Sequence, residues 1–185
     1  MKKEIRMIGV DDSPFERHDK HVLVVGAFYR GGQWLDGVMS CHVQKDGTDA
    51  TEKIAQMINQ SKFIAQLKCI FLDGIAVGGF NIIDILELER QTTLPVIVVM
   101  RKDPDIAGME KALKKIGQEH KMEIIRKAGP IHQMGTLRVQ FVGTTLENVK
   151  EYLAIACTRA DIPEPLRTAH LIAAGIVKGQ SRGRA

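Results

Sequence analysis

The apolar pattern of this sequence changes near residue 45 from strand-like runs alone to a mixture of helical and strand-like segments, and that change most restricts the fold. Before it, three apolar runs typical of β-strands cover residues 5–10, 21–29 and 34–43. Gly31-Gly32 lies between the last two runs, and Gly-Gly in that position is typical of a β-hairpin. Three consecutive strands with short connections predict an antiparallel meander.

After the change, segments with helical spacing alternate with short apolar runs. Ile54, Met57 and Ile58 lie on one face of the first predicted helix. The predicted helices cover residues 50–61, 81–89, 103–116, 144–156 and 166–176, and the predicted strands cover residues 69–72, 94–100, 122–126 and 137–142. Because helices connect these buried strands, we expect the strands to lie parallel, with helices on both faces.

This order of elements is typical of the ribonuclease H-like arrangement, an α/β three-layer fold. Its central sheet is mixed, with three antiparallel strands followed by parallel strands. A generic doubly wound fold is the main competitor, but it would not begin with a meander. The length of 185 residues suits one domain, residues 1–185. The Gly-, Ser- and Arg-rich end, residues 178–185, is expected to be a mobile tail.

Cysteine usage and the apolar runs indicate the compartment. Cys41, Cys69 and Cys157 are dispersed in apolar stretches without a C-x-x-C pair, so we expect buried, reduced thiols. The charged first seven residues lack the apolar core of a signal peptide, and no apolar run is long enough to span a bilayer. We therefore expect a cytoplasmic protein that does not enter the membrane. Its net charge of +4 permits a polyanionic partner without requiring one.

Acidic residues end two of the predicted strands. Asp11-Asp12 ends the first strand, and Asp73 ends the strand at residues 69–72. In a ribonuclease H-like sheet these strands are neighbours, so their carboxylates can converge on Mg²⁺ or Mn²⁺. Successive residues of a strand point to opposite faces, so only one of Asp11 and Asp12 is expected to face the site.

These acids also have purely structural interpretations. The segments 11–14 and Asp73-Gly74 have compositions common in turns. Function is favoured for Asp11-Asp12, because a pair of acids at the exit of a buried strand is costly unless it is used. Function is favoured for Asp73 because the Gly-rich turn at residues 74–79 lets a backbone come close. Asp49, with Glu52 three residues later, suits a helix cap as well as a metal site, and Asp103 suits a cap.

Three other features of the sequence could contact phosphate. The Gly-rich turn at residues 74–79 could offer backbone N–H groups or could be a packing turn, but it matches no nucleotide-binding motif. Arg101 and Lys102 follow the strand at residues 94–100 and could neutralise a phosphate or form a solvated strand end. His170, on the last helix, could be a catalytic or ligand residue or an ordinary packed one.

Several segments together resemble a known family. They are Gly9-Val10-Asp11-Asp12-Ser13-Pro14-Phe15, Thr48-Asp49-Ala50-Thr51, Leu72-Asp73-Gly74-Ile75, Leu94-Pro95-Val96-Ile97-Val98-Val99 with Arg101-Lys102, and Arg167-Thr168-Ala169-His170. In this order they resemble an archaeal family of unknown function that is related to endonuclease V. The resemblance extends over residues 8–183.

The resemblance implies a ribonuclease H-like fold and metal-dependent cleavage of a phosphodiester near a deaminated base. It implies site residues at Asp11 with Asp12 beside it, at Asp49 or Glu52, at Asp73 and at Lys102, with His170 in the place of a family acid. Endonuclease V also has a strand-separating Pro-Tyr-Ile-Pro wedge, where this chain has Gln44-Lys45-Asp46-Gly47. Lesion recognition of that type is therefore not expected.

The resulting hypothesis is a Mg²⁺- or Mn²⁺-dependent nuclease that acts on DNA or RNA. The catalytic candidates are Asp11, Asp73, Lys102 and His170, and the metal candidates are Asp11, Asp12, Asp49 and Asp73. One alternative is a non-catalytic nucleic-acid-binding module with the same fold. Another is an enzyme for a small phosphorylated metabolite that uses the turn at residues 74–79. The sequence indicates neither the substrate nor the oligomeric state.

Overall fold

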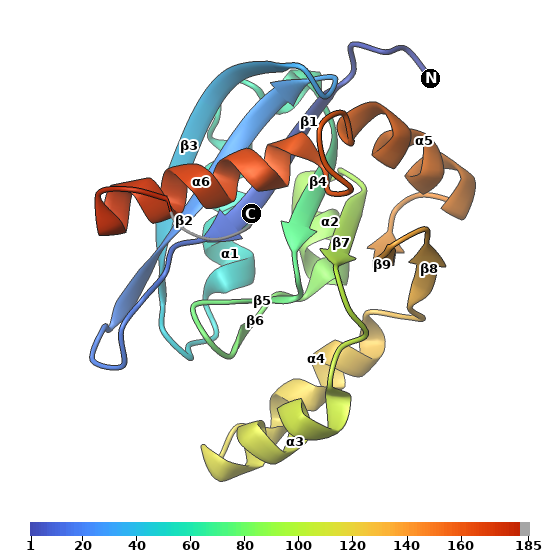
Figure 1. The fold of residues 1–185 in the computed structure, drawn as a ribbon. Coiled ribbons are helices and arrows are strands. Elements are labelled where there is room, and N and C mark those ends of the chain that lie inside the picture. The colour runs from blue at the N-terminus through green and yellow to red at the C-terminus, as the bar shows by residue number, and fades with distance from the viewer. Residues whose placement is uncertain (182–185) are drawn as a thin grey trace.

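A mixed sheet of seven strands forms the middle of the molecule in a computed structural model, which describes residues 1–181 (Figure 1). The strand order is β3-β2-β1-β4-β7-β9-β8. The strands are β1 Arg6–Asp12, β2 His21–Arg30, β3 Trp34–Gln44, β4 Leu67–Asp73, β7 Val96–Met100, β8 His132–Met134 and β9 Leu137–Val142. Two short strands, β5 Ala76–Val77 and β6 Asn81–Ile82, pair separately as a hairpin.

Helices cover both faces of the sheet and complete the predicted three layers (Figure 1). They are α1 Ala50–Asn59, α2 Ile85–Thr92, α3 Ile106–Lys115, α4 Met122–Lys127, α5 Leu146–Ala156 and α6 Glu164–Lys178, with short 3₁₀ turns η1 Ile64–Gln66 and η2 Glu119–Lys121. Alternate strand residues separate the two cores: Ile8 and Leu72 pack with α1 and α2, whereas Met7 and Phe71 pack with α5. Among residues 1–181, no helix has both the length and the apolar character needed to cross a bilayer.

The central pairings confirm the predicted mixed sheet. The meander is antiparallel, and β4 lies parallel to both β1 and β7. The last strand departs from the expected direction, since β9 is antiparallel to β7. After the α3–α4 excursion the chain enters β8, and a tight turn through Gly135, with a φ of 60°, reverses it into β9.

Three local predictions were wrong. Residues 122–126, predicted as a strand, form α4, because a short apolar run does not by itself distinguish a helix from a strand. The helix predicted from residue 81 begins at Ile85, because residues 81–82 pair in β6. The cap of α3 is Asp105 rather than Asp103: its side chain accepts the Gly108 N–H.

Two further expectations are refined by the structure. All three cysteines are free, but Cys69 alone is fully buried, whereas Cys41 and Cys157 are half-buried. The tail predicted as mobile, residues 178–185, begins at the last residue of α6. Residues 182–185 lie outside the described residues.

The first turn of α6 lies directly on the backbone of β1. A Cβ atom at Gly9 would overlap the main chain of Pro165 and Leu166. Leu166, Ala169 and Ala173 of α6 are buried beneath the helix. Glycine at position 9 is therefore required by this close approach, which sets the position of α6 across the sheet.

Gly9→Ala is expected to lower the free energy of unfolding by about 1–3 kcal/mol, because the new methyl group has no space beneath α6. Urea denaturation followed by circular dichroism measures the change. Gly175→Ala is the matched control, since a Cβ there meets no atom within 4 Å, and it should stabilise α6 by about 0.5–1 kcal/mol. Equal effects of the two substitutions would contradict the close-approach argument.

Candidate functional site

Two predicted acids meet at the carboxyl ends of β1 and β4. These strands are parallel, and Val10 lies opposite Leu72 in their register. The next residues, Asp11 and Asp73, therefore leave the sheet side by side, on the face that α5 and α6 cover. The adjacency predicted for the first and fourth strands of the main sheet is confirmed.

A cavity of about 330 Å³ opens at this edge of the sheet. The residues that line it are Asp11, Asp12, Ser13, Pro14, Phe15, Asp73, Arg101 and His170. The structure thus brings together four of the predicted site residues, which come from β1, β4 and α6. Ser13, Pro14 and Phe15 also line the cavity because the chain turns across its edge directly after β1.

His170 is the member of this group most distant in sequence, and it is held by Asp11. Its Nδ1 lies 2.9 Å from Asp11 Oδ2, and the Asp11 side chain is almost entirely buried. The other carboxylate oxygen, Oδ1, accepts the Asp12 backbone N–H at 2.8 Å. The hydrogen bond to Asp11 raises the pKa of His170 and so favours the imidazolium form.

Asp12 also lines the cavity, although its side chain leaves the opposite face of β1. Its Oδ2 accepts the backbone N–H of Gly78 at 2.6 Å. The two side chains leave opposite faces of β1, as expected for successive strand residues, and both line the cavity because it lies at the strand end. The Gly78 N–H, considered above as a phosphate donor, is instead used to hold this carboxylate.

The carboxylates at this edge repel one another. Burial and the neighbouring charge of Asp11 raise the pKa of Asp73 from 3.8 to about 6, although Arg101 and His170 oppose the shift. Burial, followed by the charge of Asp11, raises the pKa of Asp12 from 3.8 to about 6, against the Gly78 hydrogen bond. Asp12 and Asp73, with raised pKa values beside Asp11, form an environment that a bound cation would stabilise.

Asp49 and Lys102 do not line this cavity. Asp49 Oδ1 accepts hydrogen bonds from Gln44 N at 3.0 Å and from Asn81 Nδ2 at 2.7 Å. It does not cap α1 with its side chain either, because Asn81 Oδ1 accepts the Ala50 N–H. At the end of β7, Arg101 lines the cavity in place of Lys102.

A buried lysine is connected to the cavity through a series of hydrogen bonds. Lys121 is only 1% exposed, and its ammonium group donates to the carbonyl oxygens of Asp46, Gly47 and Phe80. Asp46 N in turn donates to Gly78 O at 2.8 Å, and Gly78 N donates to Asp12. This hydrogen-bonded chain links Lys121 to an acid of the cavity, and no local sequence pattern around Lys121 indicates it.

The donor chemistry of this edge suits a hard divalent cation. Among residues 1–181, no group of three or more His, Cys, Asp and Glu side chains is arranged to hold a metal ion. Mg²⁺ commonly uses only one or two carboxylates and takes its other ligands from water and substrate phosphate. Asp11 and Asp73, with Asp12 beside them, offer that number of protein ligands.

Comparisons with known proteins agree over nearly the whole chain. A family model described as endonuclease dU matches residues 3–177. The UPF0215 protein of Methanothermobacter thermautotrophicus is 48% identical over 191 residues, which is 100% of this chain and 94% of the relative. A crystal structure of a protein of unknown function from Archaeoglobus fulgidus matches with a TM-score of 0.88 at 37% identity, covering 94% of this chain and 98% of that one.

A more distant structural match concerns a DNA complex. Endonuclease V of Ciona intestinalis, crystallised with DNA that contains an inosine, matches with a TM-score of 0.64 at 15% identity. The match covers 96% of this chain and 87% of that chain. At this identity the likeness establishes the fold, and the predicted ribonuclease H-like fold class is confirmed.

Asp73→Asn is expected to raise the free energy of unfolding at neutral pH by about 1–2 kcal/mol in metal-free buffer. The folded-state pKa of Asp73 is raised to about 6, so the native state binds this proton more tightly than the unfolded chain does. The contribution of Asp73 to the stability of the unmodified protein therefore falls as the pH rises from 3.8 to about 6. The advantage of the variant should be full above this interval and lost below it.

Urea denaturation in chelator at acidic and neutral pH measures this difference. The control is Asp161→Asn, which removes an exposed acid outside the cavity and should leave stability nearly unchanged at both pH values. An Asp73→Asn variant that is destabilised at neutral pH would contradict the repulsion between carboxylates.

Proposed function

Since the chain belongs to the endonuclease dU family, as the resemblance predicted, we propose that it is a metal-dependent endonuclease that cleaves phosphodiester bonds in DNA or RNA. The observation that carries the proposal is the pair Asp11 and Asp73 at neighbouring strand ends. Burial and mutual repulsion raise the pKa of Asp73, and the cationic side chains of Arg101 and His170 stand beside it. Two carboxylates with adjacent cations suit a divalent ion and a phosphodiester.

The protein ligands for Mg²⁺ or Mn²⁺ would be Asp11 and Asp73, with Asp12 as the third candidate. When bound, such an ion lowers the pKa of a coordinated water and stabilises charge that develops on phosphate oxygens. Asp49 is not assigned to the metal, because it does not line the cavity that Asp11, Asp12 and Asp73 share. The chain's own contribution is to hold two acids rigidly at the ends of buried strands.

Arg101 and His170 would act on the phosphate and the leaving group. Arg101 lines the cavity beside Asp73 and can donate two parallel hydrogen bonds to a phosphate. The Nδ1 of His170 bonds to Asp11, which leaves Nε2 as the ring nitrogen that can donate a proton to the leaving oxygen. The raised pKa of His170 favours the protonated ring that this role needs.

Deoxyuridine in DNA is the first candidate substrate. The family description contains dU, the abbreviation for deoxyuridine, and the Ciona intestinalis relative was crystallised with DNA that contains an inosine. Both are deaminated nucleosides. The segment from Gln44 to Gly47, which differs from the endonuclease V wedge, is anchored by Lys121, so the recognition of the base is proposed to differ as well.

The purified protein should cleave deoxyuridine-containing DNA in Mn²⁺ or Mg²⁺ and not in chelator. Asp73→Asn should lower kcat by about 100-fold or more, because it removes a charged ligand of the ion. Labelled single- and double-stranded DNA and RNA, with uracil, inosine or neither, measure cleavage and substrate choice on gels. Undiminished cleavage by Asp73→Asn, or salt-sensitive binding without turnover, would contradict the proposal.

Two adjacent residues provide a matched test of the phosphate contact. Arg101→Ala should lower kcat/KM by about 10-fold or more, because it removes a charged hydrogen bond to phosphate. Lys102→Ala removes a neighbouring cation that does not line the cavity and should change kcat/KM little. A larger loss of kcat/KM for Lys102→Ala than for Arg101→Ala would assign the phosphate contact to Lys102, as the family resemblance implies.

A further inference from the structure

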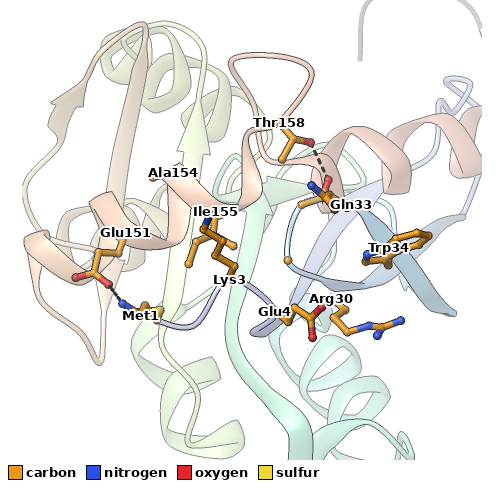
Figure 2. A pocket seen from close by; sticks show the side chains of 12 residues that line it. Met1, Lys3, Glu4, Arg30, Gln33, Trp34, Glu151, Ala154, Ile155 and Thr158 are labelled. Atoms are coloured by element: carbon orange, nitrogen blue, oxygen red, sulfur yellow. Dashed lines mark hydrogen bonds and ion pairs between the residues drawn. The ribbon is translucent and has the colours of Figure 1, made fainter.

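A second cavity, of about 640 Å³, is shown in Figure 2. It lies at the opposite end of the sheet from the acids, because its residue Arg30 pairs with Arg6 at the start of β1. Its walls come from the turn between β2 and β3, from α5, and from residues 1–4, which precede β1. Asp12 lies at the other end of the seven-residue β1, a separation of about 20 Å at the usual rise of a strand. The cavity is therefore separate from the proposed nuclease site, and its volume suits a small organic ligand.

The floor of this cavity is held in place from both sides. Gly31 N donates to Ile5 O at 2.7 Å, and Thr158 Oγ1 donates to Gly32 O at 2.7 Å (Figure 2). A Cβ at Gly31 would overlap Lys3 O, and a Cβ at Gly32 would overlap the main chain of α5. The two glycines thus allow the turn to fit tightly between the N-terminal segment and α5, so the cavity is preformed.

One wall of the cavity carries the chain's single tryptophan. Trp34 is 57% exposed and lies directly opposite Arg30 in the β2–β3 register. The Arg30 guanidinium is fixed by Asp36, with Nε 3.1 Å from Oδ2 and Nη2 3.3 Å from Oδ1. A large exposed indole beside a fixed guanidinium is a ready surface for stacking a planar ring. Ile155, on α5, lines the cavity as well (Figure 2).

Polar groups without protein partners surround this surface. Across residues 1–181, the side chains of Lys3, Glu4 and Gln33 make no hydrogen bond or ion pair with protein. Glu151 differs, because its carboxylate is paired with the amino terminus at 2.8 Å. The cavity therefore offers a free ammonium, a free carboxylate and a free amide around an exposed aromatic ring.

We propose that this cavity binds a guanine nucleotide, free or as part of a single strand. The guanine ring would stack on Trp34. The Glu4 carboxylate, which only accepts hydrogen bonds, complements the adjacent N–H donors of guanine, whereas adenine presents an acceptor in that position. The Lys3 ammonium would contact the phosphate. The binding is independent of the nuclease chemistry proposed above, since no residue is shared between the two cavities.

The single tryptophan provides a direct measurement. GMP should change the fluorescence of Trp34 in a saturable titration in chelator, and AMP should bind at least about 5-fold more weakly, because it lacks the donors that Glu4 accepts. Guanosine tests the nucleoside without phosphate, and inorganic phosphate and ribose 5-phosphate test the phosphate without the base. A single-stranded oligonucleotide with a terminal guanine distinguishes a strand from a free nucleotide, and either source supports the proposal.

Variants identify the groups that bind. Calorimetric titration with GMP should show binding about 10-fold weaker for Trp34→Leu and for Glu4→Gln. Ile176→Ala, which trims an exposed apolar residue on α6, is the control and should bind as the unmodified protein does. No saturable response at millimolar GMP, equal affinity for AMP, or binding of inorganic phosphate alone with the same affinity would overturn the proposal.

The same titration separates this proposal from the nuclease proposal. Asp73→Asn should bind GMP with unchanged affinity, because Asp73 lines the other cavity. A protein that binds GMP but cleaves no nucleic acid would support the guanine site and refute the nuclease. A protein that cleaves nucleic acid but does not bind GMP would support the nuclease and refute the guanine site. Loss of GMP binding in Asp73→Asn would show that the two cavities are not independent.

Discussion

The parallel pairing of β1 with β4 is the contact on which the rest of the structure depends. Both strands are central in the sheet and buried on both faces, so their register is fixed by packing on each side. That register places Asp11 beside Asp73, where the strands emerge from the core. The apolar residues that fold the chain therefore also bring together charges that repel one another. The hydrophobic core supplies the free energy that holds this unfavourable arrangement in place.

The helix α6 completes the arrangement from the far end of the chain. It contacts β1 at Gly9, and its small residues Ala169 and Ala173 pack against β2. A hydrogen bond of 2.8 Å joins Tyr29 Oη of β2 to Thr168 Oγ1 of the helix. With the helix fixed at these points, His170 faces the end of β1 and reaches Asp11. The packing of α6 thus places His170 where its hydrogen bond to Asp11 raises its pKa.

The sequence was informative where the order of strands or a family resemblance determines the outcome. The meander, the neighbouring β1 and β4, and the meeting of Asp11, Asp73 and His170 follow from strand order and family resemblance. The role of Asn81 in capping α1 could not be predicted, because its partners lie more than 30 residues away. Nor could Arg101 be chosen over Lys102, since the direction of each side chain depends on where β7 ends. The helix α4 was missed because its short apolar run fits either period.

The hydrogen-bonded chain from Lys121 to Asp12 has a consequence for how such sequences can diverge. The chain passes through the backbone atoms of Asp46 and Gly78, so only its two ends, Lys121 and Asp12, contribute side chains. Replacement of the lysine would leave the carbonyl oxygens of Gly47 and Phe80 without this buried donor, whereas Asp46 O would keep the hydrogen bond from Gln118 Nε2. Loss of Lys121 during divergence is therefore expected only where another buried donor reaches these two carbonyl groups. The segment that carries Lys121 is therefore expected to be conserved together with Asp12, to which its hydrogen bonds lead.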